Sequence, residues 1–178
     1  MSRVVDAGVE TRLPLFSYRV AGIDPGFNGG LALIDGGLSL RGLLDMPLRA
    51  IDGRHEVDGT KLAEILREWT PDFVVLEKVW GRAGEGGRNA FNFGRATGIV
   101  IGVLYSLGLP FIEVAPATWM SALLKGRTEE GKGRSVAWAR EHFPGAELET
   151  KRGRQLDGRS DAIGLAWYGL MSVKRQAA

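Results

Sequence analysis

The sequence predicts one α/β domain built on a mixed sheet, and two features of the chain support this prediction. Three short apolar segments at 18–24, 31–34 and 38–45 are separated by turns rich in Gly, Asp and Pro, which is typical of an antiparallel meander. Strand-like and helix-like segments then alternate, which favours parallel strands joined by crossover helices. With 178 residues, 44% of them hydrophobic, the chain is long enough to bury a sizeable core.

The elements that follow the meander are also predicted from the sequence. Apolar residues recur with helical spacing in 60–69, and the continuous apolar run 73–77 predicts a strand that is buried on both faces. The elements expected after the meander are a loop at 47–58, a helix at 60–69, a strand at 73–77, a helix at 89–107, a strand at 110–115 and helices at 118–124, 134–143 and 157–173. The prediction is a five-stranded mixed sheet, three antiparallel strands and then parallel strands, flanked by helices. The domain spans 18–173, with an N-terminal extension at 1–17 and a tail at 174–178.

Composition narrows the kinds of site that the chain can form. The absence of cysteine excludes disulfides and thiolate metal sites, and the two histidines, His55 and His142, are too scattered for a zinc site. A formal net charge of +2 and a pI near 9.1 permit a nucleic-acid ligand without requiring one. No apolar run of about 18 residues and no leader-like pattern at 1–17 are found, so we expect a cytoplasmic protein without a membrane span.

Four carboxylates in three separate segments are the candidate catalytic residues. Asp24 and Glu77 each end an apolar strand, and Asp157 and Asp161 stand four apart at the start of the last helix, so they share one helix face. Three antiparallel strands followed by alternating helices and strands form the ribonuclease H-like topology, in which the first strand lies beside the fourth and the last helix crosses the sheet. Grouped carboxylates are ligands that Mg²⁺ prefers, and two such ions can hydrolyse a phosphodiester. We expect Asp24 to bridge both ions, Glu77 to hold one and Asp161 the other, with Asp157 completing the second site or acting through water.

Each acid taken alone has a structural alternative. Asp24 precedes Pro25-Gly26 and could be a turn residue, and Asp157 could be the N-cap of the last helix. Glu77 is harder to explain in this way, because a charge at the end of a buried strand needs a partner. The four acids in one topology are far more specific than any one of them.

At these residues the chain resembles the RuvC-like Holliday junction resolvases of the ribonuclease H-like (retroviral integrase) superfamily. Gly-Ile-Asp-Pro-Gly at 22–26, Leu76-Glu77 and the segment 160–166 are similar to that family's first, second and last motifs. The segments 93–98, 116–119 and 131–144 are similar to its small-residue helix and to later motifs of its phage-type members. The likeness covers roughly 19–173 and lies in the order and spacing of short motifs.

The resemblance implies a homodimeric endonuclease of DNA recombination and repair that makes paired nicks across a four-way DNA junction. It implies two Mg²⁺ or Mn²⁺ ions per active site, no organic cofactor, and products with 5′-phosphate and 3′-hydroxyl ends. It also implies a dimer interface on the helix 89–107, which fits the glycines that recur every four positions there, Gly94, Gly98 and Gly102.

The resemblance further implies roles for residues that contact the DNA. Lys132 matches a family lysine that helps to hold the phosphate, and Trp80 matches an aromatic residue that contacts bases near the junction centre; the alternatives are a solvated loop lysine and a core tryptophan. Basic residues are also candidates for contacts with the DNA backbone, since phosphate contacts supply much of the affinity. These candidates are Arg82, Arg88, Arg127, Arg134, Lys151, Arg152 and Arg154.

Some features depart from the family pattern and leave other functions open. Typical bacterial members separate the last two ligands by three positions, so the spacing of four here favours Asp161 over Asp157 as a ligand. The same acids would serve a broader ribonuclease H-like nuclease acting on branched DNA or on an RNA–DNA hybrid. A protein that binds branched DNA without cutting it is a third possibility, against which the four acids argue. A sugar kinase or actin-like ATPase would need a second such domain, for which 178 residues leave no room.

Overall fold

The computed structural model of the protein describes residues 18–79, 86–129, 131 and 133–177. The extension at 1–17, Trp80, Arg82 and Lys132 lie outside the described residues, as does the side chain of Arg88.

Five strands form one mixed sheet, as the sequence predicts. The sheet order is β3-β2-β1-β6-β7, with β2 antiparallel to β1 and β3, and β6 parallel to β1 and β7. The strands are β1 (Arg19–Asp24), β2 (Gly30–Asp35), β3 (Leu40–Asp45), β4 (Leu48–Ile51), β5 (Arg54–Val57), β6 (Phe73–Glu77) and β7 (Phe111–Val114). The helices are α1 (Gly59–Trp69), α2 (Gly87–Leu107), α3 (Pro116–Leu123), α4 (Gly133–His142) and α5 (Asp157–Ala177).

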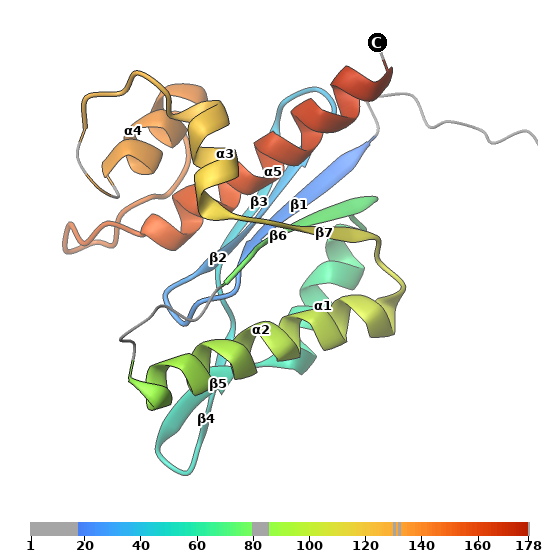
Figure 1. Ribbon diagram of the computed structural model, residues 1–178, viewed down its shortest axis with the longest axis vertical. Helices are drawn as coiled ribbons and strands as arrows, with labels where there is room; N and C mark the ends of the chain where they lie inside the picture. The colour runs from blue at the N-terminus through green and yellow to red at the C-terminus, as the bar shows by residue number, and fades with distance from the viewer. Residues whose placement is uncertain (1–17, 80–85, 130, 132, 178) are drawn as a thin grey trace, which may run out of the picture.

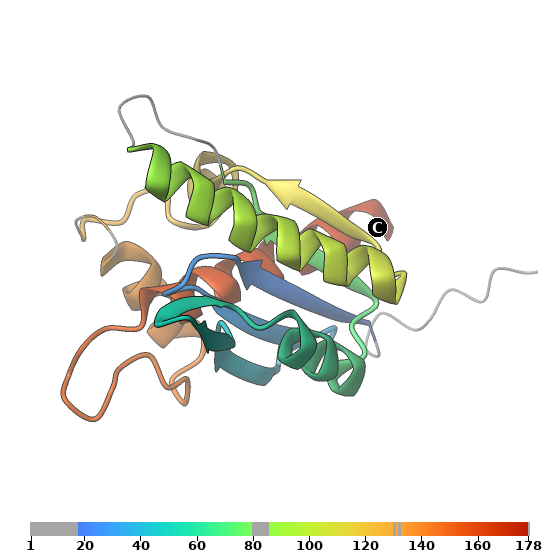
Figure 2. The same cartoon turned by 90° about the horizontal axis from the view of Figure 1, so that it is seen from below.

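Helices cover both faces of the sheet (Figures 1 and 2), so the domain has three layers. The helices α1 and α2 lie on one face, and α3, α4 and α5 lie on the other. Side chains of β1 alternate between the two cores: Val20 packs with α5, whereas Ala21 and Ile23 pack with α1 and α2. This alternation explains why the central strands are apolar at nearly every position.

The helix α5 crosses the middle of the sheet at unusually short range. A Cβ atom on Gly22 of β1 would lie 2.1 Å from the carbonyl oxygen of Ala162 and 2.5 Å from the backbone nitrogen of Ala166. Only glycine therefore permits this approach of strand and helix backbones. The helix continues to Ala177 and does not end at Val173 as expected.

The prediction of a loop at 47–58 is wrong, because β4 and β5 form a separate two-stranded antiparallel hairpin there. Asp52 and Gly53 in its turn both have positive φ, at 48° and 72°, which is the arrangement that an Asp-Gly hairpin turn favours. The carboxylate of Glu56 on β5 is almost buried and forms ion pairs with Arg49 of β4 and Arg95 of α2. The pair with Arg49 lies within the hairpin, and the pair with Arg95 joins the hairpin to α2.

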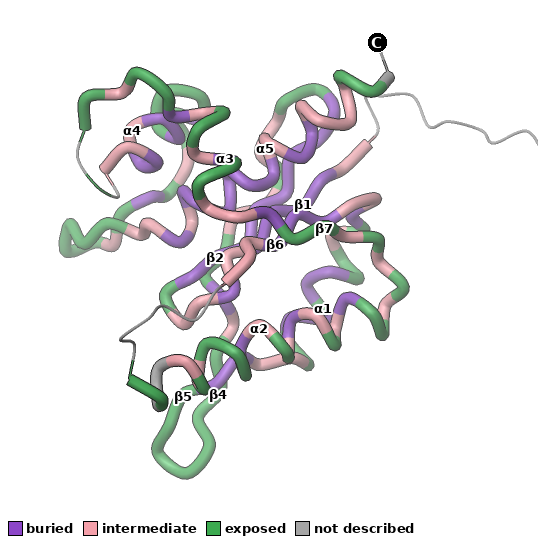
Figure 3. Tube along the Cα trace, viewed as in Figure 1, coloured by how far each residue is buried: buried purple, intermediate pink, exposed green. Residues whose placement is uncertain are grey.

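The helix α2 packs on the sheet with one side only. Its inner stripe of Ala96, Val100 and Leu104 is buried in the core, whereas its outer side is exposed along most of its length (Figure 3). By length and composition alone, the segment Ala90–Leu107 is apolar enough to cross a membrane. The prediction of no membrane span depended on the lack of one continuous apolar run and did not identify this segment.

Candidate active site at the carboxyl edge of the sheet

The two acids that end strands lie next to each other at one edge of the sheet. β1 and β6 run parallel with Ile23 opposite Leu76, so the following residues, Asp24 and Glu77, end neighbouring strands at the same edge. Both residues are half-buried. The carboxyl edge of parallel strands is where open α/β sheets bind their ligands.

The start of α5 lies at the same edge and brings the other two acids. Gly158 pairs with Gly29 of the turn between β1 and β2, and a Cβ atom on Gly158 would lie 2.1 Å from the carbonyl oxygen of Asn28. Asp157 begins the helix and is half-buried, while Asp161, one turn further, is only 5% exposed. The backbone therefore brings all four predicted acids, from β1, β6 and α5, to one edge of the domain.

Backbone and side-chain donors orient the two strand-end carboxylates. The Gly26 backbone N–H donates to Oδ1 of Asp24 at 3.1 Å, so the turn role considered for this acid is real, and it leaves the acid at the sheet edge. The Trp119 indole N–H donates to Oε1 of Glu77 at 3.0 Å. Trp119 is a contact of the site that the sequence prediction did not include; the likeness of 116–119 to a family motif was the available signal.

The donor chemistry of the four acids fits a hard divalent cation, because carboxylate oxygens are the ligands that Mg²⁺ and Mn²⁺ take. Asp24, Glu77 and Asp161 would hold such an ion, with Asp157 at the helix start beside them. Among the residues that the structure describes, no group of three or more Asp, Glu or His side chains lies close enough together to hold a metal ion. The backbone arrangement thus fits the predicted site, and the role of each acid as a ligand stays a prediction.

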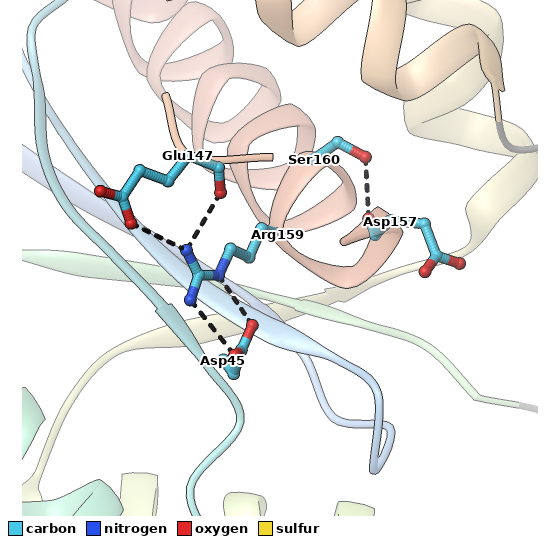
Figure 4. A network of polar contacts seen from close by, with 5 residues as sticks. All are labelled: Asp45, Glu147, Asp157, Arg159 and Ser160. Atoms are coloured by element: carbon cyan, nitrogen blue, oxygen red, sulfur yellow. Dashed lines mark hydrogen bonds and ion pairs between the residues drawn. The ribbon is translucent and has the colours of Figure 1, made fainter. Parts of the chain in front are cut away.

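A polar network fixes the first turn of α5 against the sheet (Figure 4). The Arg159 guanidinium donates to both carboxylate oxygens of Asp45, at the end of β3, with distances of 2.7 and 3.2 Å, and to the backbone oxygen of Glu147 at 3.0 Å. A two-point contact of this kind restricts orientation as well as distance. The Ser160 hydroxyl donates to the Asp157 backbone oxygen at 2.8 Å. The network therefore holds the turn that carries the acids.

The basic residues predicted to contact DNA differ in their surroundings. Arg127 forms ion pairs with Glu129 and Glu141, and its side chain is 20% exposed. Lys151, Arg152 and Arg154 lie exposed on the loop before α5, where they could reach a phosphate backbone. Arg134 is half-buried and lies at the start of α4. All five stay predictions as DNA contacts.

Comparison with known proteins shows that the chain is similar in sequence to a RuvC protein. No family model matches the chain. The crossover junction endodeoxyribonuclease RuvC of Thermomicrobium roseum is 32% identical over 105 residues, which are 56% of this chain and 63% of that protein. The match thus spans less than two thirds of the relative's length.

Solved structures share the fold over nearly the whole domain. Thermus thermophilus RuvC in complex with a Holliday junction substrate has a TM-score of 0.60 at 19% identity, covering 88% of this chain and 96% of that chain. The Thermus thermophilus RuvC structure gives 0.58 at 20% identity, covering 89% and 96%. The yeast mitochondrial Holliday junction resolvase Ydc2 gives 0.54 at 13% identity, covering 93% and 85%.

The sheet order and the crossing helix define an α/β domain of the ribonuclease H-like class. Within that class the chain is similar to RuvC in sequence over part of its length, and to RuvC and Ydc2 in fold. The resemblance predicted from its short motifs is confirmed.

Proposed function

We propose that this protein is a metal-dependent endonuclease that resolves four-way DNA junctions by paired, symmetric nicks. One observation supports the chemistry above all: Asp24 and Glu77 end neighbouring parallel strands, and α5 brings Asp157 and Asp161 to the same edge. The similarity to RuvC supports the choice of a four-way junction as substrate.

The proposed reaction is hydrolysis of a phosphodiester. The oxygen of a water molecule forms a bond to phosphorus and gives up a proton, the bond from phosphorus to the 3′ oxygen breaks, and the 3′ oxygen takes up a proton. The products are a 5′-phosphate and a 3′-hydroxyl. Two Mg²⁺ or Mn²⁺ ions, when bound, supply Lewis-acid charge to the phosphate and to the attacking water.

The four acids have different tasks in this proposal. Asp24 would be the shared ligand, because its strand β1 pairs with β6, which carries Glu77, and the turn that follows it contacts the start of α5. Glu77 would hold one ion and Asp161 the other, with Asp157 completing the second set. Carboxylates gathered in this way repel one another, and a bound cation would relieve that repulsion.

Paired nicking also requires two active sites, and we propose that the outer side of α2 joins two copies of the chain. Phe91 and Tyr105 on α2 are 67% and 73% exposed. A Cβ atom on Gly98 would meet no atom within 4 Å, so a second backbone could approach there. An apolar exposed surface of this kind marks an interaction site. A second copy suits it better than a membrane, because Arg95 on α2 holds Glu56 of the hairpin and the inner stripe of the helix belongs to the core.

A cleavage assay with Mg²⁺ tests the proposal. A labelled four-way junction is compared with a linear duplex, a fork and an RNA–DNA hybrid, and the expected result is paired symmetric nicks on the junction alone. Glu77→Gln should remove cutting, and Glu68→Gln, a neutralised acid on the exposed side of α1, serves as the matched control.

Other outcomes would replace the proposal with a different one. Cutting of the hybrid or of every branched form would make the protein a broader ribonuclease H-like nuclease. Tight junction binding by the wild-type chain without any cutting would make it a branched-DNA binding protein.

A further inference from the structure

Trp119 connects the candidate site to the core of the domain. It lies on α3, which begins directly after β7, and its side chain is fully buried. Its indole N–H donates to the Glu77 carboxylate at the end of β6, 42 residues earlier in the chain. A buried indole N–H needs an acceptor, and here the acceptor is one of the predicted catalytic acids.

The indole ring cannot turn away from this acceptor, because α5 packs against it. A Cβ atom on Gly164 of α5 would lie 2.6 Å from Cζ3 of Trp119, so the ring fills the space that glycine leaves. The same ring belongs to the core cluster that includes Ala162 and Ile163 of α5. The direction of the N–H is therefore set by packing between α3 and α5.

We propose that Trp119 is a positioning residue whose indole N–H holds the Glu77 carboxylate in the orientation that metal binding and cutting require. This inference rests on the proposed function of the site. A hydrogen-bond donor behind a metal-ligating carboxylate fixes the rotamer of that carboxylate in the orientation that binds the metal. Losing such a donor typically lowers metal affinity or activity. Trp119 acts through Glu77 and does not itself react.

The chain offers a matched control in Trp138. This residue of α4 lies in the same core cluster and is 4% exposed. Its ring stacks on His142 and meets Trp167 edge-on, in the part of the core that α4 and α5 share. Replacing either tryptophan by phenylalanine removes a similar amount of buried ring, and only the change at 119 removes the donor to Glu77.

The test compares wild-type protein with Trp119→Phe and Trp138→Phe. Binding of Ca²⁺, used as a probe, is measured by titration calorimetry, and junction binding is measured without metal. We expect Trp119→Phe to weaken Ca²⁺ binding roughly 10- to 100-fold and to raise the Mg²⁺ concentration needed for half-maximal cutting. Metal-free junction binding should stay unchanged in both variants, and Trp138→Phe should keep wild-type affinity for Ca²⁺.

The outcomes separate the two proposals. If the wild-type protein binds no Ca²⁺ and cuts nothing with Mg²⁺, the proposed function fails, and this inference fails with it. If the wild-type protein binds Ca²⁺ and cuts, but both variants bind the ion equally well, only the role of Trp119 is overturned.

A measurement on the unaltered chain covers the case in which Trp119→Phe does not fold. The indole N–H resonances of the wild-type protein are assigned by triple-resonance NMR, and Ca²⁺ is added. The Trp119 resonance should move on binding, and the Trp138 resonance should not. A Trp119 resonance that stays in place while the ion binds would overturn the inference.

Discussion

The contact between Gly158 and the turn after β1 gives the sharpest prediction about the site. A Cβ atom at this position would lie 2.1 Å from the Asn28 carbonyl oxygen and 2.6 Å from the Cα atom of Gly29. Both neighbours are backbone, so they cannot rotate away as a side chain would. The substitution Gly158→Ala must therefore separate the first turn of α5 from the turn that follows Asp24.

The size of the displacement follows from the same distances. Ordinary contact with a Cβ atom begins at 3.4 Å, so a distance of 2.1 Å requires a shift of about 1.3 Å. A misplacement of about 1 Å in a catalytic arrangement can lower the rate about 100-fold. Overpacking of this kind also costs roughly 1–3 kcal/mol of stability.

The rate of junction cutting and the free energy of unfolding are measured together in wild type, Gly158→Ala and Gly145→Ala. Gly145 follows α4, and an added Cβ atom there meets nothing within 4 Å, so this variant should behave like wild type. An alanine in an unstrained helical position normally stabilises by about 0.5–1 kcal/mol relative to glycine. A Gly158→Ala variant that is as stable as wild type or more so, and that cuts at the wild-type rate, would refute the close contact and the role given to it.

Three further predictions concern the acids, the dimer and the response to pH. Asp24→Asn, Glu77→Gln and Asp161→Asn should each abolish junction cutting and leave junction binding intact in a gel-shift assay; a variant that still cuts would remove its residue from the site. Phe91→Glu on the exposed side of α2 should lower the dimer fraction in sedimentation, and an unchanged fraction would mean that the copies meet elsewhere. Burial alone would raise the pKa of Asp35, but two backbone N–H groups and a paired guanidinium outweigh it and hold the pKa below 3.8. Because the folded-state pKa is the lower one, Asp35 stabilises the fold above about pH 3.8, and this stabilisation is lost as the pH falls through the folded-state pKa. Urea unfolding of Asp35→Asn should thus show a deficit at pH 7 that narrows in acid, and a deficit independent of pH would contradict the assignment.

The sheet and the place of the acids could be predicted because their signals are local. Strands buried on both faces are apolar at nearly every position, as 73–77 is, and such runs stand out in the sequence. Asp24 and Glu77 are the polar residues that end these runs. Once the strand order is inferred, their proximity follows from the topology alone.

The features that could not be predicted depend on contacts between distant residues. The hairpin of β4 and β5 is short and mostly exposed, so its strands lack an alternating apolar pattern. It is held by Glu56, which pairs with Arg95 of α2, and no local sequence pattern predicts that pair. The bond from Trp119 to Glu77 likewise exists only because α3 and β6 meet in the folded chain.

The contacts of α5 fall into two kinds, and the distinction explains why Gly158→Ala should affect cutting more than folding. Along its length the helix packs apolar residues such as Leu165 and Leu170 into the core, where a change of volume acts on stability directly. At its first turn the contacts include the Gly158 approach and the Arg159 network with Asp45. The first turn is itself buried at Gly158 and Ser160, but the large apolar side chains of α5, from Ile163 onward, lie further along the helix, so a shift at the helix start displaces them less. A shift at that end moves the acids while most of the packing energy is kept.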